Sequence, residues 1–185
     1  PDDVTAFEAR HAIGSTARLA LAILLYTGFR RSDAVQLGRQ HVRDGWISKP
    51  MHKGRVRRAQ RIEIPMLPEL AAAIAATRCG DMAYLATEAG QPFTIAGFGN
   101  WFRARCDEAG LKGIAAHGLR KAGATRAAEA GASAHTLMAI FGWRSLAEAE
   151  LYTRAADRKR LARDGMNLLS VPTTTSGADN HMKKS

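Results

Sequence analysis

Apolar residues recur with helical spacing along most of the chain. Near its start, Leu19, Ala22 and Ile23 occupy positions i, i+3 and i+4 within an aliphatic run. This spacing places the three side chains on one face of an α-helix. We therefore predict a helix that begins near Thr5 and ends at Gly28, because glycine commonly terminates helices.

Further segments show helical spacing or begin with a residue that favours a helix start. Ser32 and Thr94 suit the N-cap position, and Pro68 suits a first turn. Ser145 and Glu148 have the Ser-x-x-Glu spacing of a capping box. The predicted helices cover residues 32–38, 67–74, 94–110, 118–130, 133–141, 145–152 and 157–169.

The pattern changes to that of short β-strands in the first half of the chain. Residues 45–48 and 61–64 are predicted to form two strands, the second stopped by Pro65. A basic hairpin tip, residues 49–58, lies between them, and residues 82–85 are expected to add a third strand. The sequence thus predicts a mainly helical α+β domain with a small antiparallel three-stranded sheet.

The size and composition of the chain fit one folded domain. It has 185 residues, of which 46% are hydrophobic and 24% are charged, and domains commonly contain about 100–200 residues. We expect residues 1–169 to form this domain and residues 170–185 to form a flexible tail. The longest apolar run, residues 19–25, is shorter than the roughly 20 residues that a membrane-spanning helix needs.

The chain carries a large excess of positive charge. Its 27 Lys and Arg residues against 17 Asp and Glu give a formal net charge of +10. Little of this charge lies in the final stretch, where Lys183 and Lys184 face one acidic residue, Asp179. The sequence shows no basic amphipathic helix of the kind that binds membrane surfaces. Nucleic acid is therefore the expected partner, and no membrane partner is expected.

The usual sequence patterns of metal and nucleotide sites do not occur. There is no glycine-rich phosphate loop and no His-Glu-x-x-His. The two cysteines, Cys79 and Cys106, lack the spacing of a zinc site or a disulfide framework. We therefore expect no metal and no cofactor. The chain also opens without a secretory leader, so we expect a cytoplasmic protein with reduced thiols.

Four short motifs stand in the order and at the spacings of one enzyme family. They are TGFRRSD at residues 27–33, HGLRK at 117–121, FGW at 141–143 and LY at 151–152. With these motifs the chain closely resembles the tyrosine recombinases, or phage-type integrases, over residues 5–169. A single motif of this length would carry little weight, but four in register are specific.

The resemblance implies a chemistry for five of these residues. Members of the family attack a DNA phosphodiester with a tyrosine, here Tyr152, and form a 3′-phosphotyrosyl intermediate. The 5′-hydroxyl of another strand then attacks this intermediate and reverses the step. Arg30 and Arg120 would hold the non-bridging oxygens, since a guanidinium can make two parallel hydrogen bonds to them. His117 would contact the scissile phosphate and help to move the proton. Trp143 replaces the commoner histidine and would hydrogen-bond the phosphate through its indole N–H.

Two further roles concern a lysine and a carboxylate. The family's hairpin lysine protonates the departing 5′-oxygen, and Lys53 fits this role best because Lys-Gly follows the strand that contains Trp46. Lys49 remains a competitor for the same role. Asp33 stands where the family usually has glutamate, and we expect it to orient His117 or an arginine through hydrogen bonds.

Other residues compete for roles or add contacts. Tyr26 and Tyr84 are alternative nucleophiles, but each fits a buried position, whereas Tyr152 lies in a polar context. Sequence-independent phosphate contacts are expected from the remaining basic residues. These residues are Lys49, Arg55, Arg57, Arg58, Arg61 and Lys121.

The resemblance also implies partners and an assembly. Family members act as tetramers on two DNA duplexes, exchange a C-terminal segment, here residues 157–169, and in some systems use an accessory directionality protein. The partner would be a double-stranded recombination site of a mobile element, in the prokaryotic cytoplasm or nucleoid. The family's N-terminal DNA-clamping domain does not fit within this chain, so we expect the catalytic domain alone. The alternatives are a type IB topoisomerase and a degenerate fold that only binds DNA.

Overall fold

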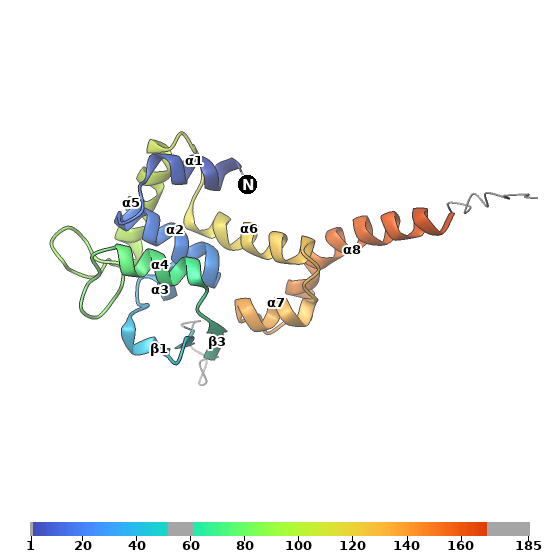
Figure 1. Cartoon of the computed structure of the whole chain (residues 1–185), viewed down its shortest axis with the longest axis horizontal. Coiled ribbons are helices and arrows are strands. Elements are labelled where there is room, and N and C mark those ends of the chain that lie inside the picture. Colours follow the sequence, from blue (N-terminus) through green and yellow to red (C-terminus); the bar gives the residue numbers. More distant parts are fainter. Residues whose placement is uncertain (1, 52–60, 170–185) are drawn as a thin grey trace, which may run out of the picture.

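The chain is mainly helical with a small three-stranded antiparallel sheet at one edge (Figure 1), which confirms the fold class expected from the sequence. The computed structural model describes residues 2–51 and 61–169 (Figure 1). The α-helices are α1 (Asp2–Arg10), α2 (Thr16–Thr27), α3 (Arg31–Ala34), α4 (Pro68–Ala76), α5 (Ile95–Glu108), α6 (Ala116–Glu129), α7 (Ala134–Phe141) and α8 (Leu146–Leu169), with a 3-10 turn, η1 (Arg39–His41). The strands are β1 (Val42–Arg43), β2 (Trp46–Pro50) and β3 (Arg61–Pro65).

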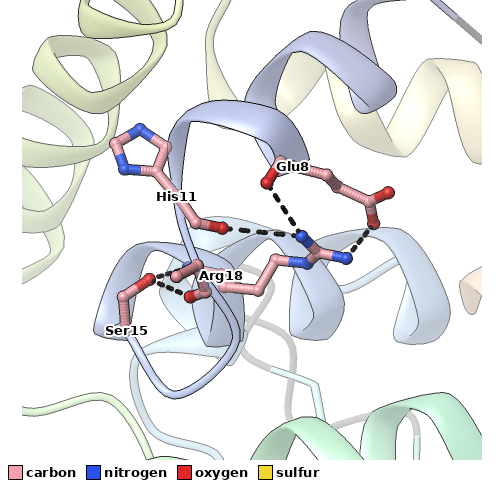
Figure 2. A network of polar contacts seen from close by, with 5 residues as sticks. Glu8, His11, Ser15 and Arg18 are labelled. Atoms are coloured by element: carbon pink, nitrogen blue, oxygen red, sulfur yellow. Dashed lines mark hydrogen bonds and ion pairs between the residues drawn. The ribbon is translucent and has the colours of Figure 1, made fainter.

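The expected first helix is two helices, and a polar network holds the break between them. Arg18 in α2 forms an ion pair of 2.9 Å with Glu8 in α1 and donates to the Glu8 carbonyl at 3.1 Å (Figure 2). It also donates to the carbonyl of His11, in the connecting turn. Ser15 caps α2 by accepting from the Arg18 backbone N–H at 3.2 Å. The apolar spacing continues across the turn, so it does not mark this break.

Several helix starts agree with the sequence, and one does not. Thr94 caps α5 by accepting from the Gly97 N–H, and Pro68 is the first residue of α4. The helix α3 is shorter than expected, and its N-cap is Arg30 rather than Ser32. Arg30 thus stands in extended backbone where the chain leaves the preceding turn.

The sheet is antiparallel and three-stranded, but its third strand is not the expected one. β1 pairs with β2, and β2 pairs with β3. Residues 82–85 instead pack outside the sheet, where Tyr84 donates its backbone N–H to the Leu37 carbonyl at 2.8 Å. Two residues of β1 are too few to show an alternating pattern, so the sequence gives no signal for that strand.

One face of the sheet is buried, and it includes a lysine. Ile47 lies opposite Ile64, and Lys49 lies opposite Ile62. Successive side chains of a strand point to opposite faces, so Lys49 shares the inner face with Ile47. The side chain of Lys49 is 1% exposed. Residues 52–60, which include most of the predicted hairpin tip, lie outside the described part of the chain, as does the predicted tail.

The C-terminal helix is longer than expected. Residues 145–152 and 157–169 were predicted as separate helices, whereas α8 is continuous. Its first turns pack against α6 and α7, and its remainder extends away from the body (Figure 1). Exposed apolar side chains on this extension are Leu161, Met166, Leu168 and Leu169. None of the helices in the described ranges is long and apolar enough to cross a membrane.

The interior has two apolar clusters that meet at Gly28. The larger cluster includes α2, the sheet and α5, and the smaller includes α6, α7 and the start of α8. Gly28 ends α2 with a φ of 61°, a left-handed conformation that favours glycine. A Cβ atom there would collide with the ring of Phe141, which belongs to the smaller cluster. The close approach of the clusters therefore requires glycine.

Replacing Gly28 by alanine should destabilise the fold. The left-handed backbone and the collision with Phe141 together should lower the free energy of unfolding by about 2–5 kcal/mol. Urea denaturation monitored by tryptophan fluorescence measures the change. The matched control is Gly165→Ala, a helical position with open space around it, which should gain about 0.5–1 kcal/mol. Equal stability of Gly28→Ala and the wild type would contradict this account.

Candidate active site

The first motif places Arg30 at the edge of a groove. The left-handed turn at Gly28 redirects the chain after α2, and Arg30 follows in extended backbone with φ −67° and ψ 155°. Its side chain is half-buried. Arg30 lines a groove of about 480 Å³ together with His117, the second residue of α6. Residues of the first and second motifs are therefore neighbours.

Arg120 lies one turn further along α6 and is buried, with 4% of its surface exposed. Its Nη1 donates to the Gly28 carbonyl, and its Nη2 donates to the Phe141 carbonyl at 2.5 Å. Its guanidinium carbon lies 5.3 Å from the ring centre of Phe141 and 5.5 Å from that of Trp143. A single side chain thus ties together the first, second and third motifs.

The charge of Arg120 responds to its neighbours. The pKa of Arg120 is lowered to about 10, mainly by burial and to a smaller extent by the nearby Arg30 cation. The negative charges of Glu148 and Asp33, and the phenol of Tyr152, act in the opposite direction. Arg120 stays cationic at neutral pH, because this value remains well above 7. The same interactions show that Arg30, Asp33 and Tyr152 all lie within electrostatic range of one guanidinium.

An aromatic stack supports the predicted nucleophile. Trp143, which is 4% exposed, stacks on Phe141 with ring centres 5.0 Å apart. It also stacks on Tyr152, with ring centres 5.1 Å apart and an interplanar angle of 10°. Tyr152 is half-buried on α8. Stacking of this kind limits the orientations of the phenol ring and so restricts where its hydroxyl can point.

The two rival tyrosines are less suitable. Tyr84 is 4% exposed, and burial raises its pKa above the ordinary value of tyrosine. Tyr26 is half-buried on α2. Its pKa is also raised, mainly by burial and to a smaller extent by the negative charge of Glu69. Neither tyrosine is among the groups whose charge acts on Arg120, whereas Tyr152 is.

Asp33 and Lys49 form a buried polar group beneath this site. Asp33 is fully buried, and Lys49 donates from Nζ to the Gln36 side chain at 3.5 Å. Burial lowers the pKa of Lys49, and the negative charge of Asp33 partly opposes that shift. Asp33 therefore lies near two buried cations, Lys49 and Arg120. The burial of Lys49 argues against the expected contact of its side chain with DNA.

Some of the other predicted residues are exposed, and the rest lie outside the described part of the chain. Lys121 is exposed on α6, and Arg61 is exposed at the start of β3. Arg61 donates to the Ser48 hydroxyl at 2.7 Å. Four predicted residues lie outside the described part of the chain: Lys53, Arg55, Arg57 and Arg58. The choice between Lys49 and Lys53 therefore depends on the position of Lys49 alone.

Sequence reasoning missed the partners of Arg120. The carbonyls of Gly28 and Phe141 belong to the motifs, but main-chain acceptors leave no mark in a sequence. The inward direction of Lys49 was predictable, because Ile47 two residues earlier is apolar and strands alternate. Across residues 2–51 and 61–169, no group of three or more His, Cys, Asp or Glu side chains is placed to hold a metal ion.

Solved structures with the same fold are DNA recombinases and integrases. A crystal structure of the XerA recombinase superposes with a TM-score of 0.70 at 22% identity, covering 88% of this chain and 61% of that one. A λ integrase dimer bound to a core site gives 0.66 at 17% identity, covering 82% and 57%. The Tn1549 transposon integrase with right-end DNA gives 0.60 at 20%, covering 78% and 57%. The chain therefore spans about three-fifths of the length of these proteins.

Residues 4–159 match the model of the phage integrase family. This match spans well over half of the chain, so the protein belongs to the phage integrase family, as its four motifs indicate. No curated protein sequence matches the chain.

Replacing Arg120 by lysine should destabilise the fold although the charge is kept. A lysine ammonium cannot donate to two carbonyls in the fixed geometry of a guanidinium, and it lacks the planar group that lies near the Phe141 and Trp143 rings. We expect a loss of about 1.5–3 kcal/mol in the free energy of unfolding, measured by urea denaturation. Lys121→Ala, at the exposed neighbouring position, should change it by less than about 0.5 kcal/mol. An Arg120→Lys protein as stable as the wild type would show that the two hydrogen bonds are dispensable.

Proposed function

We propose that this chain is the catalytic domain of a site-specific DNA recombinase that cleaves and rejoins strands through a phosphotyrosyl intermediate. One observation carries the proposal: residues from four separate motifs meet around the Arg120 guanidinium. The charges of Arg30 and Tyr152 both affect the pKa of this group. The fold shared with recombinases and integrases, some bound to DNA, supports the same conclusion. The substrate is a double-stranded recombination site of a mobile element.

In the first step, the Tyr152 oxygen attacks phosphorus and the bond to the 5′-oxygen breaks. A free phenol has a pKa of about 10, so a tyrosine nucleophile must lose its proton to an acceptor as it attacks. His117 is the proposed acceptor, because it lines the groove beside Arg30. The phosphotyrosyl bond conserves the energy of the phosphodiester, so rejoining needs no ATP.

Two arginines stabilise the charge that develops on the non-bridging oxygens. Arg30 is half-buried beside the groove and can contact the phosphate directly. Arg120 uses two of its five N–H donors on the carbonyls of Gly28 and Phe141. The others, with the full positive charge, are available from the floor of the site. Fixed cations of this kind act most strongly where water is excluded.

The leaving 5′-oxygen takes a proton from Lys53, and Lys49 has a positioning role. Lys49 is buried on the inner face of the sheet and lies near Asp33. Its position suits it to fix the Asp33 carboxylate beneath Arg120 rather than to reach a leaving group. Trp143 holds the ring of Tyr152 by stacking.

Four copies of the chain are proposed to assemble on two duplexes. The support is the distal part of α8, which extends from the body (Figure 1). Its side chains Leu161 and Met166 are each 65% exposed. Exposed apolar side chains on a helix that extends from the body are expected to pack against a second protein surface. Residues 157–169 are thus the proposed segment exchanged between neighbouring copies.

Tyr152→Phe should abolish the covalent adduct while DNA binding is retained. The substrate is a library of nicked duplexes with a randomised centre, in which loss of the short cleaved fragment prevents rejoining. Wild-type protein should become attached to a subset of the library, detected after denaturation and identified by sequencing. The variant should bind this subset normally and yield no adduct, because it lacks the attacking oxygen.

Tyr26→Phe and Tyr84→Phe provide the controls, and both should still form the adduct. Peptide mapping of the wild-type adduct should locate the DNA on Tyr152. An adduct on another residue, or one that persists in Tyr152→Phe, would refute the assignment. Relaxation of supercoiled DNA by wild-type protein without a paired site would favour a topoisomerase instead.

A sulfur leaving group separates the roles of the two lysines. Lys53→Ala should slow cleavage by about 10²–10⁴-fold, the usual contribution of a general acid. Replacing the bridging 5′-oxygen with sulfur should restore the rate, because a thiolate leaves without being protonated. Lys49→Met should lose activity that sulfur does not restore. Rescue of Lys49→Met and not of Lys53→Ala would reverse the assignment.

A further inference from the structure

We propose that Arg31 and Arg103 form a second phosphate subsite, which holds a DNA backbone phosphate next to the scissile one. Both arginines line the groove of about 480 Å³ that also contains Arg30 and His117. This inference rests on the proposed function for the identity of the neighbouring phosphate. Neither arginine belongs to the catalytic residues assigned above.

The charge of the groove suits a polyanion. Three arginines and a histidine line it, and none of its described lining residues is acidic. Arg31 and Arg103 are exposed, and neither forms an ion pair with a described carboxylate. Several other arginines of the chain do, including Arg18, Arg105, Arg154 and Arg160. The two guanidiniums in the groove therefore keep their donors available to a ligand.

The size of the groove allows more than one phosphate. A water molecule occupies about 30 Å³ in the liquid, so about 480 Å³ is far more than a single phosphate group requires. Arg30 and His117 take one phosphate in the proposed reaction. Successive phosphates on one DNA strand are separated by a rise of only about 3.4 Å, so a groove that binds one of them brings the next within reach.

A glycine in α5 makes room for Arg31. An ideal Cβ atom built on Gly99 would lie 3.4 Å from the guanidinium carbon of Arg31 and much closer to its Nη1. The guanidinium thus lies directly across the backbone of α5, on the side where a side chain would project. Glycine is disfavoured in a helix interior. Glycine at residue 99 leaves this space open to Arg31.

The expected role of the subsite is to set the register of the DNA. Contacts to phosphates fix the position and orientation of a duplex without reading its sequence. Arg31 directly follows Arg30 in the chain, so a phosphate held by Arg31 constrains the one that Arg30 receives. Arg103 approaches from α5. The subsite therefore holds the DNA strand from two elements, with Arg31 on α3 and Arg103 on α5.

The test measures binding of the full chain to a fluorescein-labelled duplex of mixed sequence at several salt concentrations. Arg31→Ala and Arg103→Ala should each weaken binding by about tenfold at low salt. Each should also reduce the slope of log K against log salt by about 0.9, the value for one lost phosphate contact. The charge-matched control is Arg43→Ala, on β1 and outside the groove, which should leave both values unchanged.

Gly99→Ala is a further test that keeps every charge. Its methyl group should shift the flexible end of Arg31 and weaken binding by less than Arg31→Ala does, with no fall in melting temperature. In a protein that already carries Arg31→Ala, Gly99→Ala should have no further effect. Wild-type affinity and salt slope in both Arg31→Ala and Arg103→Ala would overturn the subsite. Equal losses from Gly99→Ala in both backgrounds would overturn the link to Arg31.

The covalent-adduct assay distinguishes failure of this inference from failure of the proposed function. Wild-type adduct on Tyr152 together with unchanged binding by the variants would reject the subsite and leave the recombinase proposal intact. A reduced salt slope in the variants without any wild-type adduct would support phosphate binding and reject the strand-cleavage chemistry.

Discussion

The buried guanidinium of Arg120 is the interaction on which the candidate site depends. Its two carbonyl partners, Gly28 and Phe141, are 92 and 21 residues away along the chain. A buried cation without hydrogen-bond partners would be strongly unfavourable, so these segments must meet where Arg120 can reach both. The left-handed turn at Gly28 allows the ring of Phe141 to approach. Fold stability and the geometry of the candidate site therefore depend on the same contacts.

The site concentrates positive charge at some electrostatic cost. Arg30 and Arg120 lie close enough for their repulsion to affect the pKa of Arg120. Asp33, fully buried, offsets part of this repulsion and also lies near Lys49. A phosphate between the arginines would supply the remaining compensation. Such a site is arranged for an anion before the anion arrives, which is the condition for electrostatic stabilisation of a transition state.

Local sequence rules predicted the helices better than the sheet or the breaks. Caps such as Thr94 and Pro68 act within one turn, so they are visible in the sequence. The break between α1 and α2 has a local cap, Ser15, but the long side chain of Arg18 also stabilises it by reaching back across the turn to Glu8. β1 has two residues and forms because β2 lies beside it. Contacts between segments decide such features, and spacing along the chain does not encode them.

The sequence by itself determined the family, because four motifs in order identify Arg30, His117, Arg120 and Tyr152 without any coordinates. Only the tertiary structure decided what each side chain touches. It buries Arg120 on main-chain carbonyls, brings Lys49 near Asp33 and stacks the Tyr152 ring on Trp143. The physical reason is that a motif records which residue types occur at which separations, whereas burial and hydrogen bonding arise when distant segments pack and exclude water.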